Sequence, residues 1–242
     1  MESVIEQRLA DLVLDQPATA KVLESYGLDY CCKGGRSLQQ ACAEKGLDVK
    51  EVSEKLETVL RSATPSNTGF RPDQLSMSGL IDHIESVHHA YVKATIPSLL
   101  KHTERIALVH GREHPELLDV RDHFAITAGE FTQHMAKEEL ILFPWIKKTE
   151  QALLSGAPRP ALPFGTFSNP IAAMEAEHLA EGDRLALIRE ITNDLTPPEG
   201  ACTTYRLTFE ELKQFEEDLH VHVHLENHLL FPKAIALDGE SK

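Results

Sequence analysis

Two segments of the chain repeat one arrangement of histidine, glutamate and proline. His134 and Glu138 are followed, after three residues, by Leu-Phe-Pro, and His222 and Glu226 are followed by the same tripeptide at the same distance. Residues four apart lie on one face of an α-helix, because the helix turns once every 3.6 residues or so. Each copy therefore aims an imidazole and a carboxylate at one place, and two facing copies would bind metal.

The neighbouring apolar residues indicate that both pairs face a protein core. Each pair lies within one stripe of residues spaced i, i+3, i+4, i+7 and i+11, which is typical of a core-facing helix. The apolar members of these stripes are Phe131, Met135 and Leu142 in the first copy and Leu219, Val223 and Leu230 in the second. An ionised carboxylate in such surroundings costs several kcal/mol unless its charge is compensated. An ordinary His/Glu ion pair would explain one copy equally well, but the duplication favours a metal-binding bundle.

Composition and charge exclude several classes of protein. The 242 residues are 42% hydrophobic with both charge signs interspersed, which predicts a folded chain with room for one large and one small domain. No apolar run approaches the roughly 20 residues of a membrane span, and the N-terminus lacks the order of a signal peptide. A net charge of −14 repels phosphate backbones and anionic lipid surfaces. We therefore expect a cytoplasmic protein that binds neither nucleic acid nor membrane.

A polar segment separates two predicted domains. It is rich in Ser, Thr, Asn, Gly and Pro and lacks apolar periodicity, as expected of a linker. We place a small helical domain at 1–62, the linker at 63–75 and the larger domain at 76–242. The small domain carries capping-box patterns that begin at Ser37 and Asp48.

The larger domain contains four long amphipathic segments without strand-like alternation. This pattern predicts four helices, at about 78–110, 115–151, 170–195 and 203–237. We expect Asn169 to cap the third helix, with Pro170 at its first position. The protein is therefore predicted to be all-α, with the larger domain a four-helix bundle of two related hairpins.

The first and third helices should supply the remaining ligands of such a bundle. The third helix offers His178, which shares an inward stripe with Met174 and Leu185. On the first helix, helical phase slightly favours His88, which lies on a regular apolar stripe. Equal ligand spacing in the two hairpins favours its neighbour His89. The residues alone leave this choice open.

Four imidazoles and two carboxylates suit a dinuclear iron or manganese centre. A zinc site typically uses four ligands, fewer than the candidates present. Two further glutamates are candidates for catalytic proton transfer, since Glu130 lies one turn before His134 and Glu177 is adjacent to His178. A solvated glutamate is an equal interpretation of either residue.

Short motifs across nearly the whole chain occur in an order typical of one known family. They include Asp29-Tyr-Cys-Cys32, Ile81-Asp-His-Ile84, Met174-Glu-Ala-Glu-His178 and the segments around His134 and His222. Together they resemble the iron-sulfur cluster repair di-iron proteins, whose C-terminal half is a hemerythrin-like four-helix bundle. Carrying over that family's iron ligands, position by position, implies the set His89, His134, Glu138, His178, His222 and Glu226. The register of the family thus selects His89 over His88.

This resemblance implies a cofactor and a function. In the family, both glutamates bridge two iron ions, and an exchangeable oxo or hydroxo group completes the centre. Oxygen-carrying hemerythrins instead have an Asp five residues after a His of the last helix, where this chain has Asn227 after His222. The resemblance implies repair of iron-sulfur clusters damaged by oxidative or nitrosative stress, with damaged cluster proteins as partners and a homodimer as the assembly. The alternative is a nitric oxide or dioxygen reductase, or a sensor, that uses the same centre.

The adjacent cysteines Cys31 and Cys32 are a second candidate for chemistry. Neighbouring cysteines close only a strained ring if they are oxidised to each other, so a metal-thiolate, persulfide or exchange site fits better. The glycines that follow, with the cap at Ser37, predict a turn before a helix N-terminus, whose dipole favours thiolate. Spacing alone also allows two incidental small residues, whereas the family motif favours a functional pair. Lys33 stands where some family members have glycine, which leaves the role of the turn open.

Overall fold

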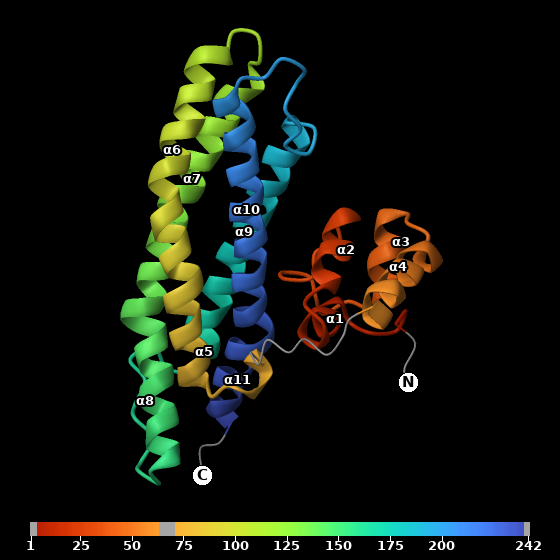
Figure 1. Ribbon diagram of the computed structural model, residues 1–242. Coiled ribbons are helices and arrows are strands. Elements are labelled where there is room, and N and C mark those ends of the chain that lie inside the picture. Colours follow the sequence, from red (N-terminus) through yellow and green to blue (C-terminus); the bar gives the residue numbers. More distant parts are fainter. Residues whose placement is uncertain (1–3, 63–70, 240–242) are drawn as a thin grey trace. The chain divides into compact units, whose positions relative to one another are not determined.

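The computed structural model describes residues 4–62 and 71–239 (Figure 1). In these ranges the regular elements are all helices, and the sole β feature is an isolated bridge between Arg8 and Ser37. The predicted all-α fold is confirmed. Among the described residues, no helix is both long and apolar enough to cross a membrane.

The chain divides into two compact units. The first comprises Met1–Leu75 together with Val223–Leu229, and the second comprises Ser76–His222 together with Leu230–Lys242. Most of the predicted linker, residues 63–70, lies outside the described part of the chain. The predicted domain boundaries stay predictions, since Val223–Leu229, about two turns of the last long helical arm, are grouped with the first unit.

In its described residues, the first unit contains four α-helices. These are α1 (Leu9–Asp15), α2 (Thr19–Ser25), α3 (Leu38–Lys45) and α4 (Val49–Ser62). The capping box predicted at Ser37 is present, because its hydroxyl accepts from the Gln40 N–H while the Gln40 side chain accepts from the Ser37 N–H. Asp48 likewise accepts a hydrogen bond from the Lys50 N–H at the start of α4. Fully buried side chains hold the four helices together, among them Leu9, Leu12, Leu23, Leu38, Val52 and Leu56.

The second unit contains four long helical arms. The first arm is α5 (Met77–His83), η2 (Ile84–His89) and α6 (Ala90–His110), and the second is α7 (Glu116–Lys137), η3 (Glu138–Leu142) and α8 (Phe143–Leu154). The third arm is α9 (Ser168–Ile191), and the fourth is α10 (Thr203–Leu225), η4 (Glu226–Leu230) and α11 (Phe231–Ala236), of which Val223–Leu229 are grouped with the first unit. Arms α6 and α7 run side by side (Figure 1). Buried aromatic rings fill the space between the arms, including Phe124, Phe131, Phe143, Phe209, Phe215 and Phe231.

Three of the four arms contain a short π-helical segment at a candidate ligand. η2 ends at His89, η3 begins at Glu138, and η4 begins at Glu226. A π-helical turn inserts extra backbone into an α-helix and is common at functional sites. Because the insertion shifts the helical phase within η2, both His88 and His89 are buried. Regular α-helical phase was therefore a poor guide to which histidine faces inward.

The start of α9 differs from the sequence expectation. The helix begins at Ser168, and its first N–H groups are capped by Asp238, which accepts from Phe167 N–H, Ser168 N–H and Ser168 Oγ–H. Asn169 instead donates to the carbonyl of Phe164. The prediction that Asn169 caps this helix was wrong, because a carboxylate distant in sequence occupies the capping position.

Candidate metal centre

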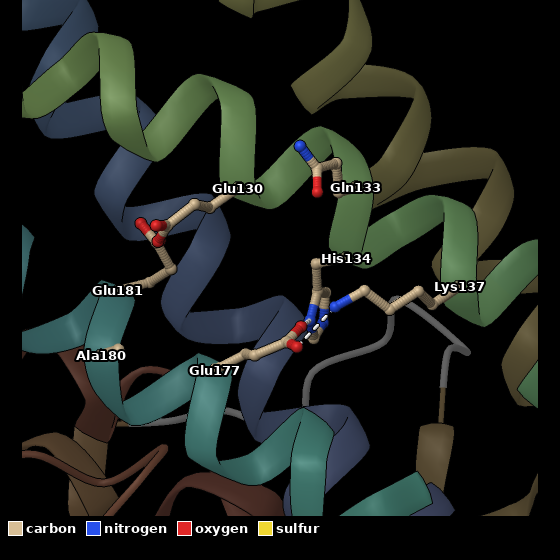
Figure 2. A pocket seen from close by; sticks show the side chains of 7 residues that line it. All are labelled: Glu130, Gln133, His134, Lys137, Glu177, Ala180 and Glu181. Atoms are coloured by element: carbon tan, nitrogen blue, oxygen red, sulfur yellow. Dashed lines mark hydrogen bonds and ion pairs between the residues drawn. The ribbon is translucent and has the colours of Figure 1, made fainter.

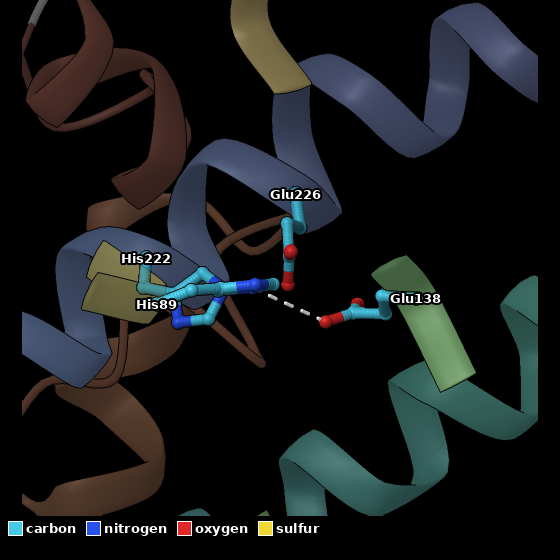
Figure 3. Close-up of side chains that lie close together, drawn as sticks. All are labelled: His89, Glu138, His222 and Glu226. Carbon is cyan, nitrogen blue, oxygen red and sulfur yellow. Dashed lines mark hydrogen bonds and ion pairs between the residues drawn. The ribbon is translucent and has the colours of Figure 1, made fainter. Parts of the chain in front are cut away.

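Six buried side chains converge inside the bundle as two groups of potential ligands. One group is His89, Glu138, His222 and Glu226, and the other is His134, Glu138, His178 and Glu226. In each group the potential ligand atoms lie within 4.8 Å of one another. The two glutamates belong to both groups, whereas each histidine belongs to one. Figure 3 shows the first group, in which the carboxylates of Glu138 and Glu226 point toward the imidazoles.

The distances between these atoms match the edges of a metal coordination sphere. The Nε2 atoms of His89 and His222 are 3.1 Å apart, and those of His134 and His178 are 2.9 Å apart. Metal–nitrogen bonds of about 2.1 Å at right angles would give an edge of about 3.0 Å. Glu138 presents one oxygen at 3.4 Å from His89 Nε2 and the other at 3.3 Å from His134 Nε2. Its carboxylate therefore faces both groups, as a bridging ligand must.

Carboxylates on the opposite side of two imidazoles orient the Nε2 atoms. His89 Nδ1 lies 2.7 Å from Glu139 Oε1, and His134 Nδ1 lies 2.8 Å from Glu177 Oε2. In each pair the imidazole donates from Nδ1, so Nε2 keeps its lone pair for a metal ion. The ammonium groups of Lys93 and Lys137 bind Glu139 and Glu177, respectively. Two lysine–glutamate–histidine chains thus support the two groups in the same way.

The two supporting glutamates are held in the ionised form. Burial by itself raises the pKa of Glu177, but hydrogen bonds from Lys137 and His134 outweigh it and leave that pKa below its usual value. The pKa of Glu139 is lowered in the same way, with burial opposed by hydrogen bonds from Lys93 and His89. Both carboxylates are therefore acceptors for the imidazole N–H groups at neutral pH.

His88 occupies a different position from its neighbour. Its Nδ1 lies 2.9 Å from Asp218 Oδ1, and its ring stacks on that of His222 with the centroids 5.6 Å apart. It belongs to neither ligand group described above. The structure thus places His89 among the converging Nε2 atoms, with His88 beside His222.

A cavity of about 270 Å³ lies next to His134 (Figure 2). Its other lining residues are Glu130, Gln133, Lys137, Glu177, Ala180 and Glu181. Glu130 does not reach a candidate ligand in the described contacts, and it forms an ion pair with Arg184 at 2.8 Å. Arg184 also binds Glu181, which is only 3% exposed. The second oxygen of Glu181, Oε2, is buried with no hydrogen-bond partner among the residues that the structure describes.

Two residues of this region were not identified as candidates from the sequence. Glu181 could have been found, since it follows His178 by three residues on the inward stripe that continues to Leu185. Glu139 gave no such signal, because it directly follows Glu138 and a regular helix would turn the two side chains to different faces. Glu139 lies outside the ligand groups and reaches the Nδ1 atom of His89 from the π-helical segment that begins at Glu138.

The donor set fits the binding of transition-metal ions. All six side chains are at most 2% exposed, and two carboxylates buried together repel each other unless cations lie between them. Imidazole suits iron, zinc and copper, and a carboxylate shared by two groups is typical of dinuclear centres in helix bundles. Two groups of four donors that share both carboxylates exceed the needs of one tetrahedral zinc ion.

Comparison with known families agrees with this geometry. Residues 79–234 match the model of the hemerythrin HHE cation binding domain, and residues 5–60 match a domain of unknown function, DUF542. The fold and the buried donors thus define a hemerythrin-type cation-binding bundle preceded by a small helical domain.

Relatives along nearly the whole chain identify the family more closely. The iron-sulfur cluster repair protein YtfE of Dickeya chrysanthemi is 34% identical over 230 residues, covering 95% of this chain and 97% of the relative. A probable iron-sulfur cluster repair protein of Haemophilus influenzae is 31% identical over 233 residues, covering 96% of this chain and 98% of the relative. The chain belongs to this family of iron-sulfur cluster repair proteins, and the resemblance seen in its motifs is confirmed.

Removing a supporting carboxylate should weaken metal binding without removing a ligand. We expect Glu177→Ala to lower the metal affinity of the ligand group that contains His134 by about 10–100-fold, because His134 loses the acceptor that orients it. Competition with a chromophoric chelator measures this affinity. Glu177→Gln, whose amide oxygen can still accept from Nδ1–H, should recover part of it. Glu175→Ala, an exposed glutamate on the same helix, is the matched control, and equal affinities for all three variants would contradict the assigned role.

Proposed function

We propose that this protein repairs iron-sulfur clusters damaged by oxidative or nitrosative stress, using two iron ions bound by His89, His134, Glu138, His178, His222 and Glu226. The main support is the buried pair of ligand groups that share two carboxylates. The names of relatives that match 95% of the chain support the same function. Two bridged irons would supply an exchangeable, redox-active metal pair in a site that these ligands shield from bulk water.

The protein's own side chains would position and protect that pair. Glu139 and Glu177 fix the imidazoles of His89 and His134, so the Nε2 atoms meet the metal ions without rearrangement. Glu138, with an oxygen facing each group, would keep the two ions together. The cavity beside His134 would allow a small molecule or a proton to approach from one side.

Isotope transfer combined with enzyme recovery tests the proposal. The protein would be loaded anaerobically with ⁵⁷Fe and mixed with a hydratase whose [4Fe–4S] cluster has been damaged by nitric oxide. Recovered hydratase activity is expected, and ⁵⁷Fe appearing in the rebuilt cluster would identify iron donation as the route. The Glu138→Gln/Glu226→Gln variant should lose the recovery, while Glu175→Gln should keep it. Equal recovery with the double variant would show that the metal centre does not carry the function.

Reduction of nitric oxide or dioxygen at the same centre is the second candidate. The observation that favours it is the cavity beside His134, which is lined by three carboxyl groups. Burial raises the pKa of Glu181, whereas the hydrogen bond from Arg184 lowers that of Glu130. Glu181 is therefore better suited to hold a proton there than Glu130 or Glu177, the residues expected from the sequence.

Product analysis separates this second candidate from repair and from sensing. Catalytic formation of nitrous oxide from nitric oxide, under anaerobic conditions with a chemical reductant, would establish reduction. Glu181→Gln should then slow turnover while leaving metal content unchanged. Reversible binding of nitric oxide without product would instead indicate a sensor. The homodimer implied by the family and the cytoplasmic location expected from the sequence stay predictions.

A further inference from the structure

The structure points to a second metal site, separate from the bundle centre: we infer that Asp29, Cys31 and Cys32 bind a thiophilic divalent cation such as Zn²⁺ or Fe²⁺. The three side chains lie in the loop between α2 and α3, within the first unit. One potential ligand atom from each lies within 4.8 Å of the others. Binding at this loop does not depend on the function proposed for the bundle.

The separations of the donor atoms correspond to edges of a coordination tetrahedron. The two sulfur atoms are 3.8 Å apart, and Cys31 Sγ is 3.3 Å from Asp29 Oδ1. In a tetrahedral site with metal–sulfur bonds of about 2.3 Å and a metal–oxygen bond of about 2.0 Å, the edges are about 3.8 Å and about 3.5 Å. The loop therefore holds the three donors near the spacing that one ion requires.

Backbone hydrogen bonds hold this arrangement in place. The N–H groups of Cys31 and Cys32 both donate to Asp29 Oδ1, at 3.1 Å and 2.8 Å. These bonds fix the carboxylate against the two thiols, so little conformational entropy is lost when an ion binds. The second carboxylate oxygen, Oδ2, takes no part in these hydrogen bonds.

Charge compensation favours a divalent ion. Cys31 is buried, and its sulfur lies beside both Cys32 Sγ and the carboxylate of Asp29. A cation bound between the two sulfur atoms would supply the positive charge that favours their thiolate forms. Two thiolates and one carboxylate then carry three negative charges, which a divalent ion offsets better than a monovalent one. Thiolates with a carboxylate suit zinc and ferrous iron better than magnesium or calcium.

The site has three protein donors, which leaves a coordination position open. Structural zinc sites use four protein ligands, whereas sites with three keep one position for water or an incoming group. Cys32 is partly exposed, in contrast to Cys31. An external thiolate could therefore complete the coordination sphere and take the ion, so the loop is suited to passing a metal ion on rather than to holding it permanently.

Cobalt titration of the full-length protein tests this site. Thiolate-bound Co²⁺ absorbs in the near ultraviolet by charge transfer from sulfur, while imidazole and carboxylate ligands do not produce this band. We expect about one thiolate-bound Co²⁺ per chain, displaced by Zn²⁺. The band should disappear in Cys31→Ser/Cys32→Ser. In Asp29→Asn, the affinity for Co²⁺ measured from the band should fall at least tenfold. Cys202→Ser, an exposed cysteine elsewhere in the chain, is the matched control and should keep the band.

Two further variants keep the result interpretable. Cys32→Ser alone changes a partly exposed side chain, so loss of the band in a variant with the wild-type circular dichroism spectrum would assign it to the loop even if the double variant fails to fold. Glu138→Gln/Glu226→Gln should retain the band, which separates this site from the bundle centre. Absence of the band from the wild type, its persistence without Cys31 and Cys32, or saturation only at millimolar Co²⁺ would overturn the inference.

Discussion

Replacing Glu138 and Glu226 together by glutamine is expected to reduce bound iron from the proposed level of about two ions per chain to less than about one, in a bundle that remains folded. Each carboxylate belongs to both ligand groups, so the double substitution removes two donors from each position and leaves two imidazoles. Glutamine has nearly the same volume as glutamate, so no cavity is created in the packed interior. Metal analysis together with the optical spectrum of anaerobically prepared protein measures the effect.

The iron content of the single variants and of an exposed control shows whether the loss is specific to the two buried glutamates. Glu138→Gln and Glu226→Gln should each lower iron content less than the double variant does, because one bridging carboxylate remains. Glu175→Gln should bind as much iron as the wild type, since this side chain is exposed on α9. A double variant that retains about two irons per chain would exclude both glutamates as the shared ligands. About one tightly bound zinc ion per wild-type chain would contradict the proposed di-iron centre.

Removal of the metal should destabilise the bundle by a large amount. A metal ion present at about a thousandfold excess over its dissociation constant stabilises the folded state by about 4 kcal/mol. For a domain of this size, each kcal/mol changes the melting temperature by roughly 2–4 °C, so we expect chelation to lower it by roughly 10 °C. Trp145 is the single tryptophan and lies on α8. Its fluorescence therefore reports on unfolding of the bundle.

In the protein without metal, substitution of Glu138 should change the melting temperature in the opposite direction. Without metal, Glu138 and Glu226 bury two carboxylates close together, and their repulsion opposes folding. Glu138→Gln should therefore melt at a higher temperature than the wild type in the apo form, and at a lower temperature when iron is supplied. Glu175→Gln should follow the wild type in both conditions. Equal melting temperatures with and without metal, or a less stable apo Glu138→Gln, would contradict this account of the centre.

Much of the candidate centre could be predicted from the sequence because its candidate ligands follow helical periodicity. His134, Glu138, His222 and Glu226 are spaced four residues apart within core-facing stripes, and His178 lies on a stripe of its own. Such patterns are local, so the chain displays them before any tertiary contact is known. The same reasoning predicted the all-α fold and the capping box at Ser37.

Other features of the structure depended on irregular helix geometry or on contacts between residues distant in sequence. Helical phase could not decide between His88 and His89, since the π-helical segment η2 changes the phase at these residues. Glu139, within η3, reaches His89 from another arm of the bundle. Asp238 caps α9 across a long stretch of chain, where the local sequence indicated Asn169.

The sequence by itself determined that two His–Glu pairs face a helical core, since side-chain direction on a helix follows from residue spacing alone. The tertiary structure decided that both carboxylates are shared between two ligand groups, and that Glu139 and Glu177 orient the histidines. These relations join residues on different helices, and π-helical turns set their exact direction. Residue spacing within one segment does not reveal which carboxylates are shared or which glutamates orient the histidines, because these contacts form only when the arms pack together.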